Sequence, residues 1–356
     1  MQQIYSLIKK LPSPRGLSQF TLSNIGLLYK SSFVLLMSHF DFLFSDLIRY
    51  FHRKYPENLS EKEFSFTFNE LKQFDSVSDV LDFAINKEVE KILYANLAEQ
   101  KKYFKSHMKV DLKEKIIDWG RITEAVERRN IIVHNNGMVN KRYLKNADLS
   151  AIPSEAKQQL KEGAKITVDK DYLDSVFNEI FSAGVILIQS CWRKWDGDSV
   201  NGADLALIAI VYEALSKEKW QVAERLGCFG KECEAHNERN HLYLAVNYCQ
   251  SLKWQGKNDE LSKELEQFDP TSLRPIYLLA YYTLKSDIDN FFKYVKDAIN
   301  VDNMGINSFF EWPLFREFRQ NPNFMKTIKK SFRAAKRKGK SVAEIPKTGE
   351  SPTAPV

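Results

Sequence analysis

The sequence has 356 residues, of which 44% are hydrophobic and 28% are charged. This composition excludes a disordered or a fibrous chain and is typical of a globular protein long enough for two domains. The formal net charge of +6 permits a polyanionic partner but does not require one.

The cysteines and the apolar runs indicate the cellular compartment in which the protein is expected. The chain contains four cysteines and begins with no secretory h-region, which indicates a reducing compartment in which thiols stay free. Its longest apolar runs, residues 32–44 and 183–188, are too short or too interrupted by polar side chains to cross a bilayer. We therefore expect a cytoplasmic protein that has no membrane partner.

The N-terminal part is expected to be helical. Residues 1–19 contain prolines and a glycine and are expected to form an arm, followed by a helix over about Leu22–Tyr55 that Pro56 ends. Phenylalanines alternate with polar residues over 64–68, which fits a short strand, but the flanking helices favour a surface loop. Helical spacing resumes over Val77–Tyr103.

A proline-free stretch from Asp111 to His134 predicts an amphipathic helix, the motif helix, which Gly137 ends with a left-handed cap. At 100° per residue, Arg129 lies near the middle of the apolar arc of this helix. The arc consists of Ile122, Ala125, Val126, Ile132 and Val133. An unpaired guanidinium in such a place is costly, so Arg129 must meet a core carboxylate such as Asp46, a partner chain or a phosphate.

The rest of the first domain follows the motif helix. We expect a linker, a short strand at Ile166–Val168 and a helix over about Asp171–Trp195, whose apolar positions fit the 3.6-residue period. This last helix closes a first domain, residues 20–195. Turn-forming residues then predict a hinge over 196–202.

Helical hairpins recur over residues 203–335. Leu215, Leu252 and Leu284 occupy similar positions in them, and their spacings of 37 and 32 residues bracket the 34-residue period of tetratricopeptide repeats. We expect a tetratricopeptide-like repeat array, with an irregular helical bundle as the alternative. Residues 336–356 are basic and then rich in Pro, Ser and Thr, which predicts a disordered tail.

The end of the motif helix has the pattern Arg129-Asn130-x3-His134, followed by Asn135-x-Gly137. This pattern resembles the R-x4-H signature of the HEPN superfamily, and residues 32–49 resemble the long helix that packs against the motif helix in that superfamily. The resemblance covers about residues 20–195. It implies a HEPN-like helical bundle and carries no information on the residues that follow. Together with the tetratricopeptide-like array predicted from the hairpin spacing, it gives an all-α fold. It also implies the activity of the metal-independent ribonucleases found in bacterial antiphage-defence and toxin systems.

One position departs from the superfamily. HEPN toxins that are paired with nucleotidyltransferases usually have a tyrosine two residues after the motif histidine, whereas Asn136 stands here. Control by modification of that tyrosine is therefore not expected for this chain.

Arg129, His134 and Asn130 are the catalytic residues that the resemblance implies. In a straight helix Arg129 and His134 project about 140° apart, so one chain is a poor source of a compact site. Two antiparallel copies of the helix would bring both pairs into one cleft, which is also how HEPN ribonucleases are built, so we expect a homodimer. No protein nucleophile or cofactor motif is recognisable, and the substrate is therefore expected to be RNA, cut by its own 2′-hydroxyl. The place of His134 near a helix C-terminus favours its imidazolium form and the role of an acid.

Histidines and cysteines elsewhere suggest no second site. Cys228, Cys233, His236 and His241 have the ligand types of a zinc site but not a standard spacing. Helical packing explains the cysteines as small buried residues and leaves the two histidines on a charged surface, so no metal is expected. Packing or surface roles are expected for His39, His52 and His107.

A second class of function competes with the ribonuclease. If Arg129 pairs with a core carboxylate and His134 caps the helix carbonyls, the protein is a non-catalytic interaction protein that dimerises and presents its repeats to a protein partner. RNA cleavage that disappears on His134→Ala favours the ribonuclease, and unchanged behaviour favours the alternative.

Overall fold

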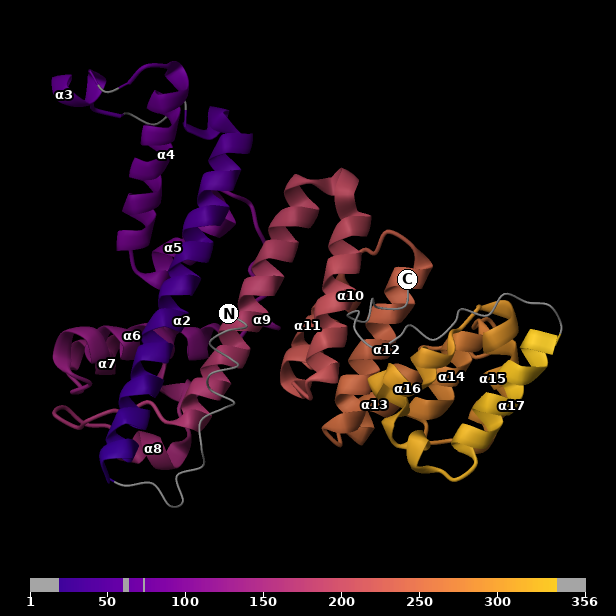
Figure 1. Ribbon diagram of the computed structural model, residues 1–356. Coiled ribbons are helices and arrows are strands. Elements are labelled where there is room, and N and C mark those ends of the chain that lie inside the picture. The colour runs from indigo at the N-terminus through magenta and orange to yellow at the C-terminus, as the bar shows by residue number, and fades with distance from the viewer. Residues whose placement is uncertain (1–18, 60–63, 73, 338–356) are drawn as a thin grey trace. The chain divides into compact units, whose positions relative to one another are not determined.

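The computed structural model of the chain describes residues 19–59, 64–72 and 74–337 (Figure 1). Within these ranges the regular structure is helical, without a strand, and only an isolated antiparallel bridge joins Met138 to Lys165. The all-α prediction is therefore confirmed, and the short strand expected at Ile166–Val168 is wrong. The expected N-terminal arm up to residue 18 and the tail beyond Arg337 lie outside the described residues.

Contacts divide the chain into two compact units, and the division falls between Asp196 and Gly197. The first unit contains eight of the described α-helices. These are α2 (Gln19–Lys54), α3 (Phe68–Leu71), α4 (Val77–Tyr94), α5 (Leu97–Ser106), α6 (Trp119–Asn135), α7 (Lys141–Asn146), α8 (Ser154–Gln158) and α9 (Lys170–Trp195).

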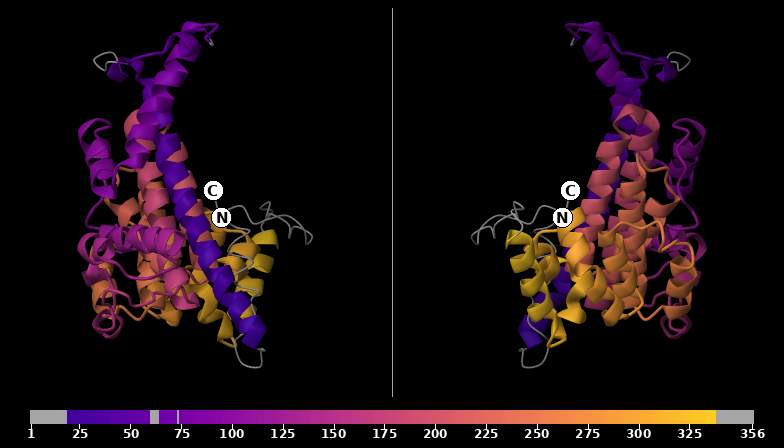
Figure 2. Two further views of the ribbon diagram at one scale, coloured as in Figure 1. Left: turned by 90° about the vertical axis from the view of Figure 1, so that its left-hand side faces the viewer. Right: turned by 90° about the vertical axis from the view of Figure 1, so that its right-hand side faces the viewer.

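The long helix α2 organises the first unit because three other helices, α4, α6 and α9, pack against it (Figure 2). Its buried residues Phe33, Met37, Phe40, Phe44 and Ile48 recur every three or four positions and so form one face. Burial of each such side chain contributes about 1.5–3 kcal/mol. Periodicity predicts α2 and α9 to within a few residues of their observed ends.

Two helices begin at residues that the sequence pattern does not predict. The motif helix is α6, and it starts at Trp119 instead of Asp111, because the carboxylate of Asp118 accepts from the Arg121 amide as an N-cap. The helix expected over 77–103 is two helices, since Asn96 caps a new helix by accepting from the Glu99 amide. The apolar periodicity continues across both caps, so the sequence pattern does not indicate that a helix begins there.

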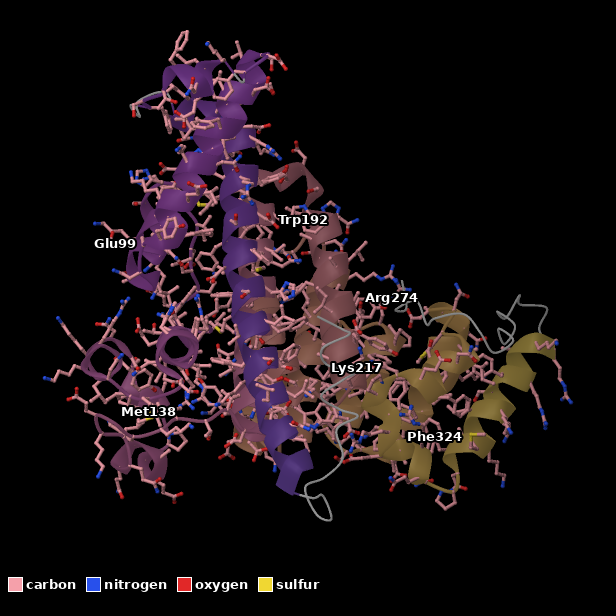
Figure 3. All side chains as sticks on the ribbon, turned by 60° about the vertical axis from the view of Figure 1, so that its left-hand side comes forward. Glu99, Met138, Trp192, Lys217, Arg274 and Phe324 are labelled. Atoms are coloured by element: carbon pink, nitrogen blue, oxygen red, sulfur yellow. The ribbon has the colours of Figure 1, made fainter. Side chains whose placement is uncertain are left out.

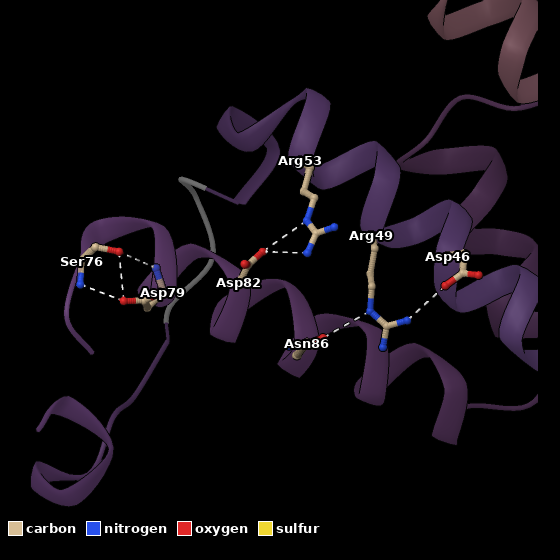
Figure 4. Close-up of polar contacts among 7 residues, drawn as sticks. All are labelled: Asp46, Arg49, Arg53, Ser76, Asp79, Asp82 and Asn86. Carbon is tan, nitrogen blue, oxygen red and sulfur yellow. Dashed lines mark hydrogen bonds and ion pairs between the residues drawn. The ribbon is translucent and has the colours of Figure 1, made fainter. Parts of the chain in front are cut away.

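Polar contacts fix the end of α2 to α4 (Figure 4). Arg49 donates to Asn86 and also pairs with Asp46 three residues before it, while Arg53 pairs with Asp82. These groups are largely exposed, so each pair contributes little, about 0–1 kcal/mol. Asp46 is thus engaged locally, and the expectation that it pairs with Arg129 is wrong.

The second unit is a succession of helical hairpins. Its helices are α10 (Val200–Ser216), α11 (Trp220–Glu232), α12 (Glu238–Trp254), α13 (Asn258–Leu265), α14 (Pro275–Leu284), α15 (Ile288–Val301), α16 (Ile306–Glu311) and α17 (Phe324–Arg337). Helix α10 begins inside the expected hinge, after a 3-10 turn over Gly197–Ser199.

Three hairpins share one turn geometry. Each turns at a residue with positive φ, namely Glu218, Gly256 and Ser286. In each turn the next amide N–H donates to the carbonyl five residues before it, over 2.8 to 3.1 Å. The equivalent turn residues are 38 and 30 residues apart, so the units are irregular in length, and the three leucines taken as equivalent from the sequence are not in register.

Two helical stretches, Asn24–Lys54 and Gly197–Ser216, are long and apolar enough to cross a membrane by length and composition alone. No such stretch is expected from the sequence pattern. Core helices of soluble proteins pass the same test, and 39% of each apolar window is buried inside the protein. Cytoplasmic location remains a prediction.

Candidate functional site

A buried ion pair anchors α6 one residue before the motif arginine. Arg128 donates from Nε to Glu124, four residues earlier, over 2.6 Å, and the Glu124 side chain is fully buried. The hydroxyls of Tyr143 and Tyr172 each donate to the same carboxylate over 2.7 Å. The carboxylate is therefore well satisfied, as a buried charge requires.

Tyr172 also stacks on this pair, because the Arg128 guanidinium lies 3.8 Å from the centre of its ring. A second Arg128 nitrogen donates to the Thr167 carbonyl over 3.0 Å. Burial, with the nearby Glu124 carboxylate, raises the pKa of Tyr172 well above its ordinary value, so its hydroxyl stays a donor. Arg128 is thus the arginine of α6 that forms the buried ion pair. Helical periodicity instead predicts that Arg129 is the enclosed arginine.

Arg129 takes a different direction, toward α2. Its Nη2 donates to Asp41 over 2.9 Å, and the two side chains keep 26% and 38% of their exposure. The Nε of Arg129 is buried and has no hydrogen-bond partner within the described ranges. A carboxylate partner was one of the three predicted, and the structure identifies it as Asp41.

Burial raises the pKa of Asp41, and the Arg129 charge opposes part of that rise. The desolvation of the carboxylate therefore outweighs its attraction to the guanidinium. The pair consists of one hydrogen bond between partly exposed side chains, where an ion pair contributes little, so a phosphate with two available oxygens would compete for Arg129 effectively.

Asn130 and His134 lie one turn apart on the last turns of α6. Asn130 is half-buried and His134 is exposed. Neither side chain has a hydrogen-bond partner among the residues that the structure describes. The expectation that His134 caps the helix carbonyls is therefore not met, and its imidazole is available to a ligand.

Hydrogen bonds and two left-handed residues define the conformation of the chain that follows His134. Asn136 has the left-handed conformation with φ 49°, and Gly137 follows with φ 78°. The Gly137 amide donates to Ile131, and its carbonyl accepts from Ile166. A Cβ on Gly137 would lie 2.7 Å from the Ile166 carbonyl oxygen, so only glycine fits. Met138, labelled in Figure 3, continues this segment.

A groove of about 520 Å³ lies beside the motif, between α2 and the end of α6. Val34 and Leu35 line it from α2, and Ile132 and Val133 line it from α6. The lining is mostly apolar. Asn136, two residues after the exposed His134, also lines the groove.

The same side of α2 exposes an apolar row. Leu28, Leu35 and Phe42 are seven residues apart and are 40%, 45% and 59% exposed. Seven residues make about two helical turns, so the three side chains form one seam, the spacing at which helices pair. Together with Val133, which is 50% exposed, this seam is an apolar surface adjoining the motif residues.

Arg129, Asn130 and His134 share no hydrogen bond or ion pair with one another within the described chain. Arg129 lies against α2, whereas His134 points to solvent at the end of the helix. One copy of the chain therefore presents the three groups on a common helix end without assembling them into a compact site.

The cysteines and histidines of the second unit do not form a metal site. The described residues contain no group of three or more His, Cys, Asp or Glu side chains placed to hold a metal ion. The His236 amide donates to Asp204 over 2.8 Å in a structural contact.

A larger polar hollow, of about 660 Å³, lies between α4 and α5 and includes none of the motif residues. Tyr103 lines this hollow, and its hydroxyl lies 2.6 Å from Nε2 of the buried His52. This contact confirms a packing role for His52, and His39 is exposed as expected.

A comparison with protein-family models, with curated proteins and with solved structures finds no match for this chain.

Proposed function

We propose that the protein is a metal-independent RNA endonuclease of a bacterial antiphage-defence or toxin system, and that its site forms between two copies of the chain. One observation carries the proposal: an arginine held only by a weak ion pair and an unbonded, exposed histidine lie on the last turns of one helix, beside an exposed apolar groove. The likeness of this pattern to the HEPN signature supports it.

The second copy supplies what one chain lacks. Arg129 and His134 project from different sides of α6, so a phosphate cannot contact both within one chain without the helix lying in the way. The apolar seam of α2 and the adjoining groove are suited to a twofold contact, in which each copy covers the seam of the other. The two motif helices then border one cleft.

The reaction uses a nucleophile that the RNA itself provides. The 2′-oxygen attacks the adjacent phosphorus and loses its proton to solvent, and the bond from phosphorus to the 5′-oxygen breaks. His134 gives a proton to the departing 5′-oxygen. The products are a 2′,3′-cyclic phosphate and a 5′-hydroxyl end.

Arg129 stabilises the extra negative charge of the transition state. When the phosphate arrives, the guanidinium exchanges its contact with Asp41 for charge-assisted hydrogen bonds to phosphate oxygens. Asn130, one turn before His134, orients the imidazole or a phosphate oxygen. The buried pair of Arg128 and Glu124 holds the helix in place while this exchange occurs.

The repeat unit binds a protein partner or senses a trigger in this proposal, because stacked helical hairpins form extended binding surfaces. It takes no part in bond breaking. We infer a cytoplasmic location, where RNA substrates are present.

A non-catalytic interaction protein is the second candidate, and the ion pair between Asp41 and Arg129 favours it, since that contact gives Arg129 a structural role. In that case the dimer would present its repeats to a partner and leave RNA intact.

The test is a cleavage assay on total RNA and on a defined oligonucleotide. Cleavage should persist in EDTA, leave 2′,3′-cyclic phosphate ends, and stop when a 2′-deoxynucleotide precedes the scissile bond. A requirement for added metal, or equal cleavage of DNA, would contradict the mechanism.

A further inference from the structure

The last described helix, α17, concentrates the positive charge of the chain. It contains six basic residues and no acidic one, while the formal charge of the whole chain is +6. The six are Lys326, Lys329, Lys330, Arg333, Lys336 and Arg337. The remaining residues are therefore neutral in total, and the excess charge of the protein corresponds to one helix.

The six cations lie on a single face. At 100° per residue they fall within an arc of about 120°, and they extend over about 16 Å of helix axis. The opposite face is apolar and buried, through Phe324, Ile328, Phe332 and Ala335. Figure 3 labels Phe324 at the start of this helix. We call the outward arc the basic face of α17.

These cations are exposed, and none has an ion-pair partner within the described chain. Other lysines of the same unit have carboxylate partners, such as Lys231 with Glu264 and Lys257 with Glu224. The usual arrangement, in which surface charges of both signs alternate, is thus absent on this face. Mutual repulsion of six cations is unfavourable unless an anion covers them.

Local helix energetics explains only part of the pattern. Cations near a helix C-terminus are stabilised by the helix dipole, which accounts for Lys336 and Arg337. Lys326 lies in the first turn, where the same dipole disfavours a cation. A requirement beyond helix stability is therefore needed for the complete array.

An acidic membrane surface is a poor fit. Helices that lie in a membrane interface insert their apolar face among the lipids. The apolar face of α17 is occupied, since Phe324 packs on Phe291 and Phe332 packs on Phe309. Only the charged face is available, and it suits a partner that presents closely spaced negative charges, as a nucleic-acid backbone does.

We propose that the basic face of α17 binds the phosphate backbone of RNA without regard to sequence. This surface lies in the unit that has no part in the proposed bond breaking, and it raises the local concentration of substrate. The binding does not depend on the cleavage chemistry and is measured without it.

The experiment measures binding of a fluorescent single-stranded RNA to the full chain carrying His134→Ala, so that no cleavage interferes. Lys329→Glu with Arg333→Glu reverses two charges of the basic face. The control, Lys263→Glu with Lys296→Glu, makes the same change of net charge at two exposed lysines of α13 and α15.

We expect the affinity of the α17 variant to fall at least about tenfold at low salt, and that of the control to fall less than about threefold. The dependence of log affinity on log salt should become shallower by about 0.7 for each phosphate that the variant no longer neutralises. Equal decreases in both variants would overturn the proposal, because they would reflect net charge alone. Binding that follows the α17 charges on phosphatidylserine vesicles but not on RNA would also overturn it.

The two proposals fail separately. If the basic face of α17 binds RNA but the wild type does not cleave it, the binding surface is supported and the ribonuclease proposal is contradicted. If the wild type cleaves RNA but the α17 variant keeps its RNA affinity, the ribonuclease proposal is supported and the binding surface is contradicted.

Discussion

The carboxylate of Asp41 on α2 accepts a hydrogen bond from Nη2 of Arg129 on α6 over 2.9 Å. This single contact joins the motif arginine to the helix that organises the first unit. It uses one of the five donors of the guanidinium. Arg129 serves either as a structural link between α2 and α6 or as a ligand for the substrate phosphate. The cleavage activity of a variant changed at Asp41 distinguishes the two roles.

Asp41→Asn should leave cleavage at or above the wild-type kcat/KM, because it removes the negative charge that faces Arg129 without changing the shape of the contact. Arg129→Ala should lower kcat/KM by at least about a hundredfold, as expected when a group that stabilises transition-state charge is removed. Steady-state cleavage of a defined RNA compares the two. If Asp41→Asn is as inactive as Arg129→Ala, the pair itself is the functional element.

The raised pKa of Asp41 has a consequence for stability. Between its ordinary pKa and the raised one, the folded protein binds the proton and the unfolded chain does not. The contribution of this group to the free energy of unfolding therefore falls as pH rises through that window and is constant above it. Urea denaturation at a series of acidic pH values should show this fall in the wild type relative to Asp41→Asn. A difference of opposite sign would mean that the attraction to Arg129 outweighs the desolvation and that the pKa of Asp41 is lowered in the folded protein.

Leu35→Glu should abolish the dimer and the cleavage activity while the fold persists, because Leu35 is 45% exposed and lies in the apolar seam. The matched control is Leu205→Glu on α10, where the leucine is 46% exposed. Light scattering at micromolar concentration and circular dichroism measure the two effects. A wild-type monomer, or a fully active Leu35→Glu monomer, would argue against a shared cleft.

Glu124→Ala should destabilise the protein by about 3–5 kcal/mol, since it leaves the buried Arg128 without its carboxylate. Glu114→Ala is the control, because Glu114 pairs with Lys101 and Lys105 at the surface, where such pairs contribute about 0–1 kcal/mol. Chemical denaturation gives both values. Equal, small effects would mean that the buried network does not anchor α6.

The sequence predicts the long helices because their cores repeat regularly. The helices α2 and α9 have 36 and 26 residues. Their buried faces follow the 3.6-residue period from Phe33 to Ile48 and from Leu173 to Trp195, and no local cap interrupts them. The start of α6 and the break before α5 depend on single side-chain caps, Asp118 and Asn96, which periodicity does not register.

The two arginines of the motif helix show why site geometry is harder to predict. Arg128 and Arg129 are adjacent, and an angle of about 100° decides which is enclosed. The enclosing groups, Tyr143 and Tyr172, come from later segments that no local pattern connects to α6. Asp41 likewise lies 88 residues before its partner. The spacing of Glu124 and Arg128, four residues apart, was the one local signal that pointed to the buried pair.

The helical hairpins of the second unit are predicted from the sequence, but the positions of their turns are not. Leucines mark the ends of the first helices, yet the equivalent positions are the residues of positive φ, and only one of these is a glycine, Gly256. Glu218 and Ser286 adopt the same conformation without a glycine to signal it.

The ribonuclease proposal is tested most directly by RNA cleavage with the wild type and His134→Ala, compared side by side in EDTA. His241→Ala is the control, since His241 is likewise an exposed histidine and lies outside the first unit. His134 is exposed and unbonded, so its replacement should leave the melting temperature unchanged. We predict that wild type and control release 2′,3′-cyclic phosphate ends and that His134→Ala is at least about a hundredfold slower. Equal cleavage by all three proteins, or none by the wild type, would contradict the claim.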